Sequence, residues 1–202
     1  MLSQEQEIRN QIRDRIENKL KNNIPSCSPE PPLKSLQLGK KLKGLPPDAE
    51  VDIPVYHGIR FKNPQDLLRK GFCISTYEMR ENIKKALDHF NIQVDKLTPL
   101  QKELLDTLYK EMEWRKDTIW AALENVCDYA KRNPEHVLQA LNIVGIPDEK
   151  IIEYIEHEFG KPYRLKLKIK PKKTDLASGT QNIRLNRRCI YPEDIEDVGA
   201  CE

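Results

Sequence analysis

The residues best suited to chemistry lie in the segment Val55-Tyr56-His57-Gly58-Ile59-Arg60-Phe61. Its apolar residues predict a short buried strand, and we expect His57 and Gly58 to stand at the end of it. Glycine leaves bare backbone beside a titratable ring. A flat polar ligand can take hydrogen bonds from such a backbone while the imidazole holds a hydroxyl group. The structural alternative is a half-buried core histidine beside a turn glycine.

The following residues predict a helix and a second strand that hold this segment in place. Asn63 is a natural N-cap, Pro64 suits the first helical position, and Gly71 suits the left-handed position just past a helix. Patterns of period two and apolar runs then predict the strands at 54–58, 72–75 and 163–169.

Helical periodicity dominates the middle of the chain. An amphipathic pattern covers residues 78–90, and Thr98-Pro99-Leu100-Gln101 is a capping box that opens a second helix. Asn133-Pro134-Glu135 and Asp148 open two more, the last of which ends at Gly160. Because helices dominate by residue count, an all-α interaction protein is one alternative to a mixed fold.

Three segments, in the same order, resemble blocks of the ADP-ribosyltransferase superfamily in its histidine branch. The segment around His57 resembles the nicotinamide-binding strand of that family. Asp117-Thr118-Ile119-Trp120-Ala121 with Val126-Cys127-Asp128-Tyr129-Ala130 looks like its second block. Residues 181–186 look like its closing strand, and residues 190–198 look like its terminal Ile-x-Pro-Glu-Asp-Ile tail. The resemblance implies an α+β fold with a split antiparallel β-core of the ADP-ribosyltransferase type.

The resemblance also implies a site that binds NAD as a substrate. His57 would hold a ribose hydroxyl, the Gly58 backbone would bind the nicotinamide carboxamide, and Arg60 would favour the pyrophosphate. These roles follow from the family pattern and from the matching residues of this chain.

An aromatic shelf for nicotinamide completes the implied site. Trp120 is the candidate by its chemistry, since indole stacks well on a pyridinium ring through the cation–π effect. A strict alignment with the family could instead place Ile119 there and turn Trp120 into the core. A rival alignment uses Ser75 and Thr76, because another branch of the family has a Ser-Thr-Ser strand after its first block.

The chain departs from the family at the catalytic position. The usual glutamate, which holds the ribose 2′-hydroxyl and stabilises an oxocarbenium-like transition state, is replaced by Asn182, beside Gln181. An amide keeps the hydrogen bond but not the negative charge, and such a loss typically costs on the order of 10²-fold or more in rate. Glu193 and Asp194 are the nearest acids that follow Asn182 in the sequence, but the family tail lies outside the cleft.

Two main function classes therefore stay open. One is an enzyme that transfers ADP-ribose from NAD to a macromolecule. The other is a catalytically inactive module on the same scaffold that binds a nucleotide, RNA or a protein. The branch that transfers a 2′-phosphate from RNA is a third class, although its arginine and histidine set is not convincing here.

Composition divides the chain into three parts. The pattern of residues 1-24 predicts an amphipathic helix. This helix either packs on the domain body or contacts a partner or a second copy, which would make an oligomer. The proline-rich residues 25-50 predict an extended connector, partly ordered at best, which carries the basic tract Lys40-Lys41-Leu42-Lys43. The resemblance assigns residues 51-202 to an ADP-ribosyltransferase-like domain, in which the helices at about 78-116 look like a large insertion.

The predicted strand at 163–169 has one strongly basic face. Apolar residues alternate there with Lys166, Lys168 and Lys170. Such a face is either simply solvated or a docking surface for an acidic partner or a phosphate backbone. It is the surface that we predict for a macromolecular acceptor, protein or nucleic acid.

Composition limits the remaining possibilities. The 202 residues are 33% charged with a formal net charge of +2, and no apolar run approaches the length of a membrane span. The five cysteines show no spacing typical of zinc sites. Their odd number and scattered positions predict free thiols, no metal site and a cytoplasmic location. The absence of a long apolar run and the polar N-terminus predict no membrane span and no secretory signal.

Overall fold

The computed structural model describes residues 35–114, 118–123, 125–176 and 182–201. The helix predicted in residues 1–24 lies outside this part of the chain. The elements in chain order are α2 (Ser35–Leu42), β1 (Val55–Phe61), α3 (Pro64–Lys70), β2 (Phe72–Cys73), α4 (Thr76–His89), η1 (Val94–Lys96), α5 (Pro99–Trp114), β3 (Ile119–Ala122), α6 (Val126–Arg132), α7 (Glu135–Ile143), α8 (Asp148–Phe159), β4 (Lys161–Leu167), η2 (Lys173–Asp175), β5 (Asn182–Leu185), β6 (Cys189–Ile190), η3 (Pro192–Asp194) and β7 (Ile195–Ala200).

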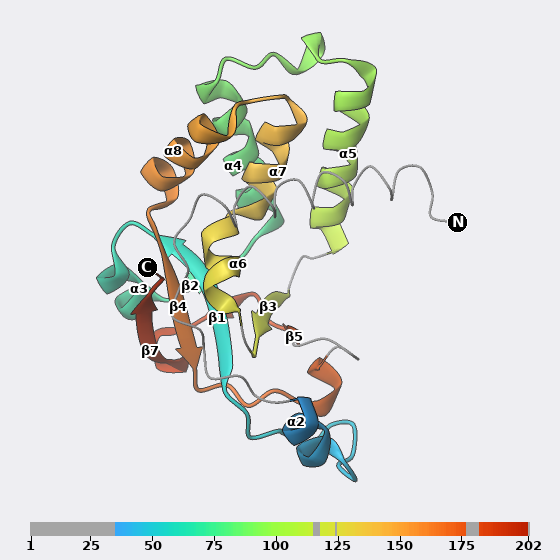
Figure 1. Ribbon diagram of the computed structural model, residues 1–202, viewed down its shortest axis with the longest axis vertical. Helices are drawn as coiled ribbons and strands as arrows, with labels where there is room; N and C mark the ends of the chain where they lie inside the picture. Colours follow the sequence, from blue (N-terminus) through green and yellow to red (C-terminus); the bar gives the residue numbers. More distant parts are fainter. Residues whose placement is uncertain (1–34, 115–117, 124, 177–181, 202) are drawn as a thin grey trace.

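The strands form two antiparallel sheets. The larger sheet has the order β5-β3-β1-β4-β7, and the smaller one pairs β2 with β6. The central strand β1 pairs with β4 along its whole length but with β3 only at Tyr56 and Ala122, so β1 and β3 part beyond that point (Figure 1). A mixed α+β fold with antiparallel sheets is therefore confirmed, and the all-α alternative is excluded.

All the predicted strands are present, but their ends differ. β1 continues to Phe61, because Gly58 to Phe61 stay paired with Arg164 to Lys161 of β4. His57 and Gly58 therefore lie in the middle of a strand, and the prediction that they end it is wrong. β2 is limited to Phe72 and Cys73, after which Ser75 caps α4.

The local helix signals predict the helices well. Gln101 N donates to Thr98 Oγ1 at 3.2 Å, and Thr98 N donates to Gln101 Oε1 at 3.0 Å, which is the capping box predicted for α5. Gly71 follows α3 with a φ of +66°, a left-handed conformation that glycine adopts without strain.

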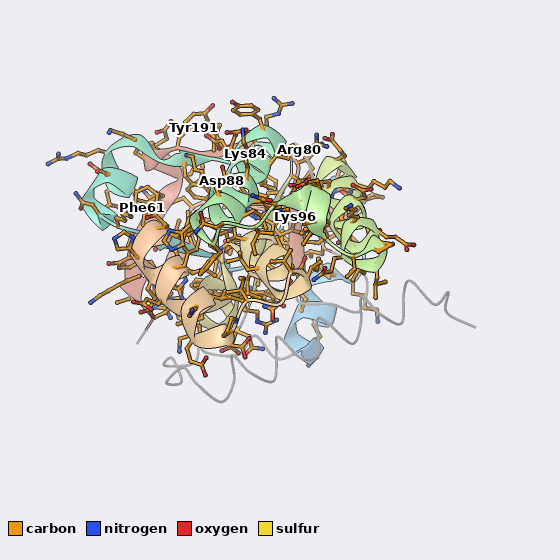
Figure 2. The ribbon with its side chains drawn as sticks, turned by 90° about the horizontal axis from the view of Figure 1, so that it is seen from above. Phe61, Arg80, Lys84, Asp88, Lys96 and Tyr191 are labelled. Carbon is orange, nitrogen blue, oxygen red and sulfur yellow. A yellow bond between two sulfur atoms is a disulfide. The ribbon has the colours of Figure 1, made fainter. Side chains whose placement is uncertain are left out.

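The helices α4, α5, α7 and α8 form their own core above the sheets (Figures 1 and 2). It is built on fully buried residues such as Ile83, Leu141 and Ile151. An ion pair of 2.7 Å between Arg80 and Glu113 joins α4 to α5 at its surface. The region predicted as an insertion thus shares one core with α7 and α8. No helix in the described part of the chain is both long and apolar enough to cross a membrane.

A second core lies against the large sheet and reaches the N-terminal side of the described chain. It contains Val55, Leu165 and Ile183, with Leu67 of α3. Leu38 and Leu42 of α2 also pack against it, although this region was predicted as an extended connector. The two leucines are only one helical turn apart, and the segment around them is rich in proline. The sequence therefore gives only a weak helical pattern here.

Four of the cysteines form disulfides, so the prediction of free thiols is wrong for them. Cys73 bonds to Cys189 with an S–S distance of 2.08 Å, and Cys127 bonds to Cys201 at 2.07 Å. The partners are 116 and 74 residues apart in the sequence, which explains why spacing alone did not reveal them. Cys27 lies outside the described residues.

Candidate functional site

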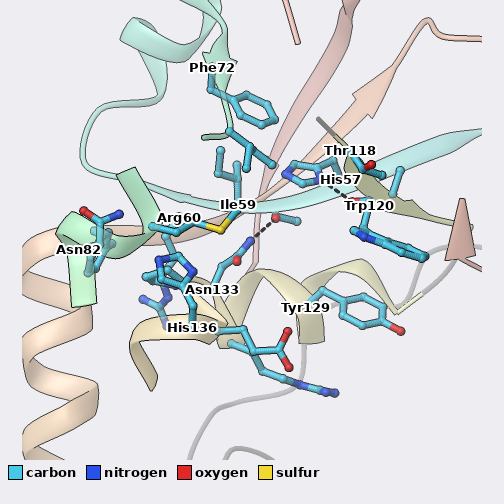
Figure 3. A pocket seen from close by; sticks show the side chains of 18 of the residues that line it. His57, Ile59, Arg60, Phe72, Asn82, Thr118, Trp120, Tyr129, Asn133 and His136 are labelled. Atoms are coloured by element: carbon cyan, nitrogen blue, oxygen red, sulfur yellow. Dashed lines mark hydrogen bonds between the residues drawn. The ribbon is translucent and has the colours of Figure 1, made fainter. Parts of the chain in front are cut away.

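A cleft of about 600 Å³ opens where β1 and β3 part (Figure 3). Residues of β1, β2, β3 and β5 line it from the sheets, and residues of α4 to α8 line it from the helices. The site residues predicted from the sequence all belong to its lining: His57, Gly58, Arg60, Trp120 and Asn182.

His57 is buried and bridges the gap between the diverging strands. Its Nδ1 lies 2.8 Å from the backbone oxygen of Trp120. A carbonyl oxygen only accepts, so Nδ1 carries the hydrogen and Nε2 of the neutral ring remains an acceptor. Burial lowers the pKa of His57 to about 4, with the Trp120 hydrogen bond acting in the opposite direction, so the ring is neutral at pH 7.

The ring of Phe72 fixes the other side of this histidine. The two rings are stacked, with centroids 5.0 Å apart and planes inclined by 17°. Phe72 comes from β2, which the Cys73–Cys189 disulfide joins to β6. The small sheet therefore helps to position His57.

Gly58 is required for a reason that the sequence did not reveal. A Cβ at this position would lie 2.6 Å from both Ala130 N and Val126 O, so only glycine lets α6 lie directly on β1. The Gly58 carbonyl accepts a hydrogen bond of 2.7 Å from Asn133 Nδ2. Gly58 thus serves helix packing, and its contact with a carboxamide stays a prediction.

Arg60 has a structural role. It is buried, and its guanidinium donates to the backbone oxygens of Gly160 at 2.9 Å and of Lys131 at 3.0 Å. Burial lowers the pKa of Arg60, and nearby Glu156 acts in the opposite direction. These bonds join the end of α6 and the end of α8 to β1, and they give no support to the pyrophosphate contact predicted for Arg60.

The structure distinguishes the two candidates for the aromatic shelf. Trp120 is 37% exposed and lines the cleft, whereas Ile119 is fully buried in the sheet core. Ile119 is not among the residues that line the cleft. Ser75 also lines the cleft, where its side chain accepts from Glu78 N at 3.0 Å as the N-cap of α4.

Asn182 opens β5 at the rim of the cleft. It pairs with Ala122 of β3, and its Oδ1 accepts a hydrogen bond of 3.3 Å from the Tyr129 hydroxyl. The Tyr129 ring is 43% exposed and has the Arg132 guanidinium 5.5 Å from its centroid. The sequence placed Tyr129 in a family block but did not assign it to the site.

The carboxylates of the cleft come from the helices. Glu78 of α4, Glu111 of α5 and Glu135 of α7 line it, and no local sequence signal pointed to them. Glu193 and Asp194 are not among the residues that line it, and Asp194 pairs with Arg187 at 3.0 Å.

The basic strand face lies outside the cleft and is partly neutralised. Lys166 Nζ bonds to Glu196 Oε1 of β7 at 2.7 Å, and this bond raises the pKa of Lys166. Lys168 and Lys170 follow the end of β4 and are exposed.

The chemistry open to the cleft is hydrogen bonding, stacking and acid–base work by side chains. Among the described residues, no cluster of three or more His, Cys, Asp or Glu could hold a metal ion.

Comparison of the chain with family models, with curated proteins and with solved structures finds no match.

Proposed function

We propose that the protein is an ADP-ribosyltransferase-like protein that binds NAD in this cleft and transfers ADP-ribose to a macromolecule. One observation carries the proposal: His57, Trp120 and Asn182, from three separate segments of the resemblance, line one cleft. Its volume of about 600 Å³ suits a small-molecule ligand. The division of the strands into two antiparallel sheets, with β1 and β3 parting at the cleft, supports a β-core of the ADP-ribosyltransferase type.

The neutral His57 is suited to a ribose. Its Nδ1 is held by the Trp120 carbonyl, so Nε2 is left to accept a hydrogen bond from a hydroxyl group. The exposed part of Trp120 offers a flat electron-rich ring to the cationic nicotinamide. The packing of Phe72 against His57 restricts the orientation of the imidazole ring. The ring therefore loses less conformational entropy when a ligand binds.

Transfer requires a carboxylate where positive charge develops. The bond between ribose C1′ and the nicotinamide nitrogen breaks, and its electron pair leaves with nicotinamide. A nucleophile of the acceptor then bonds to C1′ and releases its proton to water. Asn182 cannot supply the negative charge that stabilises the ribose cation. For a wild type that turns over NAD, we assign this role to one of the cleft glutamates, Glu78, Glu111 or Glu135.

The second candidate is a module that binds the nucleotide without turning it over. The specific observation in its favour is Asn182 itself, whose Oδ1 accepts from Tyr129 at 3.3 Å and which carries no charge. In this alternative, the glutamates of the cleft serve only the helices from which they come.

Isothermal calorimetry tests binding. We expect the full chain to bind NAD, and we expect His57→Ala to weaken binding by about 1–2 kcal/mol through the loss of one or two hydrogen bonds. His157→Ala is the matched control, because that histidine is exposed and does not line the cleft. A chain that binds neither NAD, nicotinamide nor ADP-ribose at millimolar concentration has no such site.

Turnover is measured with labelled NAD, by nicotinamide release and by modification of the protein itself. For an inactive wild type, Asn182→Glu restores the missing carboxylate and should create nicotinamide release. Asn186→Glu is the matched control, because it adds the same charge to an exposed residue that does not line the cleft. For an active wild type, Glu78→Gln, Glu111→Gln or Glu135→Gln should abolish turnover. Binding without turnover in the wild type and in Asn182→Glu would establish the binding module.

A further inference from the structure

Two groups of lysines that are far apart in the sequence meet at one end of the molecule. One group belongs to α2 and the turn that follows it, and the other follows β4. We refer to them together as the lysine surface, which consists of Lys40, Lys41, Lys43, Lys168, Lys170, Lys172 and Lys173.

Backbone hydrogen bonds hold the two segments together. Val51 N donates to Pro171 O at 2.8 Å, and Lys173 N donates to Ala49 O at 2.9 Å. The Lys173 ammonium also donates to Leu45 O at 2.8 Å. Figure 1 shows α2 beside the segment that follows β4, at the end of the molecule opposite the helices α4, α5, α7 and α8.

The lysine surface has an excess of positive charge. Residues 40–52 and 168–175 contain seven lysines and four acids, Asp48, Glu50, Asp52 and Asp175. Six of the lysines are exposed, and among the described residues none of the seven forms an ion pair. One of the acids, Asp175, is engaged by the Lys172 backbone N at 2.7 Å.

The residue types of this surface favour a phosphate backbone over other acidic partners. Residues 40–52 and 168–175 contain no aromatic residue and no arginine, whereas protein interfaces are enriched in both and depleted in lysine. Leu38, Leu42 and Leu45 pack against the sheet core, so α2 does not offer them to a lipid surface. Lysine ammonium groups bind phosphates as point charges, and binding to a nucleic-acid backbone without base contacts depends on such charges.

We propose that the lysine surface binds the phosphate backbone of nucleic acid without sequence preference. The lysines supply charge, and the surface has none of the aromatic, amide or guanidinium groups that read bases. The surface lies outside the cleft, so this proposal does not depend on the binding or turnover of NAD.

Fluorescence anisotropy with the full chain and a labelled DNA duplex of mixed sequence tests the proposal across a series of salt concentrations. The test variant combines Lys40→Gln, Lys43→Gln, Lys168→Gln and Lys170→Gln. Its matched control combines Lys84→Gln, Lys85→Gln, Lys110→Gln and Lys150→Gln, which removes the same charge from exposed helical positions. Lys84, which Figure 2 labels, lies on α4. Figure 1 shows α4 at the opposite end of the molecule from α2.

We expect the test variant to lose at least about tenfold in affinity at low salt, and its slope of log affinity against log salt to fall by about 0.9 for each lysine that contacts a phosphate. The control should keep the affinity and slope of the wild type, and a second duplex of unrelated sequence should bind equally well. Equal losses in the two variants would show only an effect of net charge and would overturn the proposal.

Two measurements on the wild type need no substitution. A wild type whose DNA affinity is absent, or independent of salt, contradicts the proposal even where a variant does not fold. Binding to vesicles that contain phosphatidylserine, or to a polyglutamate peptide, without binding to DNA would also overturn it, and would identify a lipid or protein partner instead.

Discussion

The imidazole of His57 donates a hydrogen bond of 2.8 Å to the backbone oxygen of Trp120, at the point where β1 and β3 stop pairing. A side chain thus satisfies a carbonyl that the sheet ladder leaves open. The bond fixes which ring nitrogen carries the hydrogen, and it links the two residues that we expect to contact the ribose and the nicotinamide. This relationship makes the protonation state of His57 important for both stability and binding.

We predict that His57 makes the protein less stable as the pH falls from 6.5 to about 4. Its pKa is lowered from 6.5 to about 4, so between these values the unfolded chain binds a proton that the folded chain does not. The stabilisation is complete above pH 6.5 and is lost as the pH falls through this window, by on the order of 3 kcal/mol.

Urea unfolding at a series of pH values measures this change. His57→Gln should lack the part of the pH dependence that belongs to His57, whatever its own stability. A wild-type free energy of unfolding with the same pH slope as His57→Gln between pH 4 and 6.5 would contradict the assignment.

Trp120→Ala should weaken the binding of nicotinamide and NAD by about 1–2 kcal/mol, because it removes the stacking face of the cleft. Trp120→Phe should retain part of this energy, since it keeps an aromatic face. Tyr191→Ala serves as the control in calorimetry, because Tyr191 is similarly exposed but does not line the cleft. Equal affinities for the wild type and Trp120→Ala would remove Trp120 from the ligand site.

Gly58→Ala should destabilise the fold by about 3 kcal/mol or more, because the added methyl group overlaps the backbone of α6. The comparison is with Gly199→Ala in β7, where the new Cβ meets only the end of the flexible Arg164 side chain, at 3.3 Å. Thermal and urea unfolding of the two variants give the difference. Similar stabilities of the two would mean that α6 does not press on β1.

Removal of the Cys127–Cys201 disulfide should lower the free energy of unfolding by about 2–5 kcal/mol, because the bond closes a long loop of the unfolded chain. It also ties α6, which packs on β1 beside the cleft, to the C-terminal end of β7. Cys127→Ser and Cys201→Ser should therefore have similar melting temperatures, both lower than that of the wild type. Quantitative reaction of Cys127 in the folded wild type with a thiol reagent would show that the bond is absent.

The sequence by itself determined the local elements of this protein. The capping box at Thr98 and Gln101, the helix stop at Gly71, and the alternation of apolar and basic residues over 163–169 all act between residues close together in the chain. Neighbouring residues are enough to set backbone conformation and caps, so these features can be predicted from short windows. The order of the segments that resemble the family also predicted that His57 and Asn182 belong to one site.

Only the tertiary structure decided what these residues do. Arg60 bonds to Lys131, 71 residues away, and Cys73 bonds to Cys189, 116 residues away, so no short window contains either pair. Gly58 is needed because α6 lies on it, and Trp120 reaches the cleft because Ile119 takes the buried face of β3. Packing between distant segments sets burial, and burial determines which polar groups are used within the fold and which remain available to a ligand.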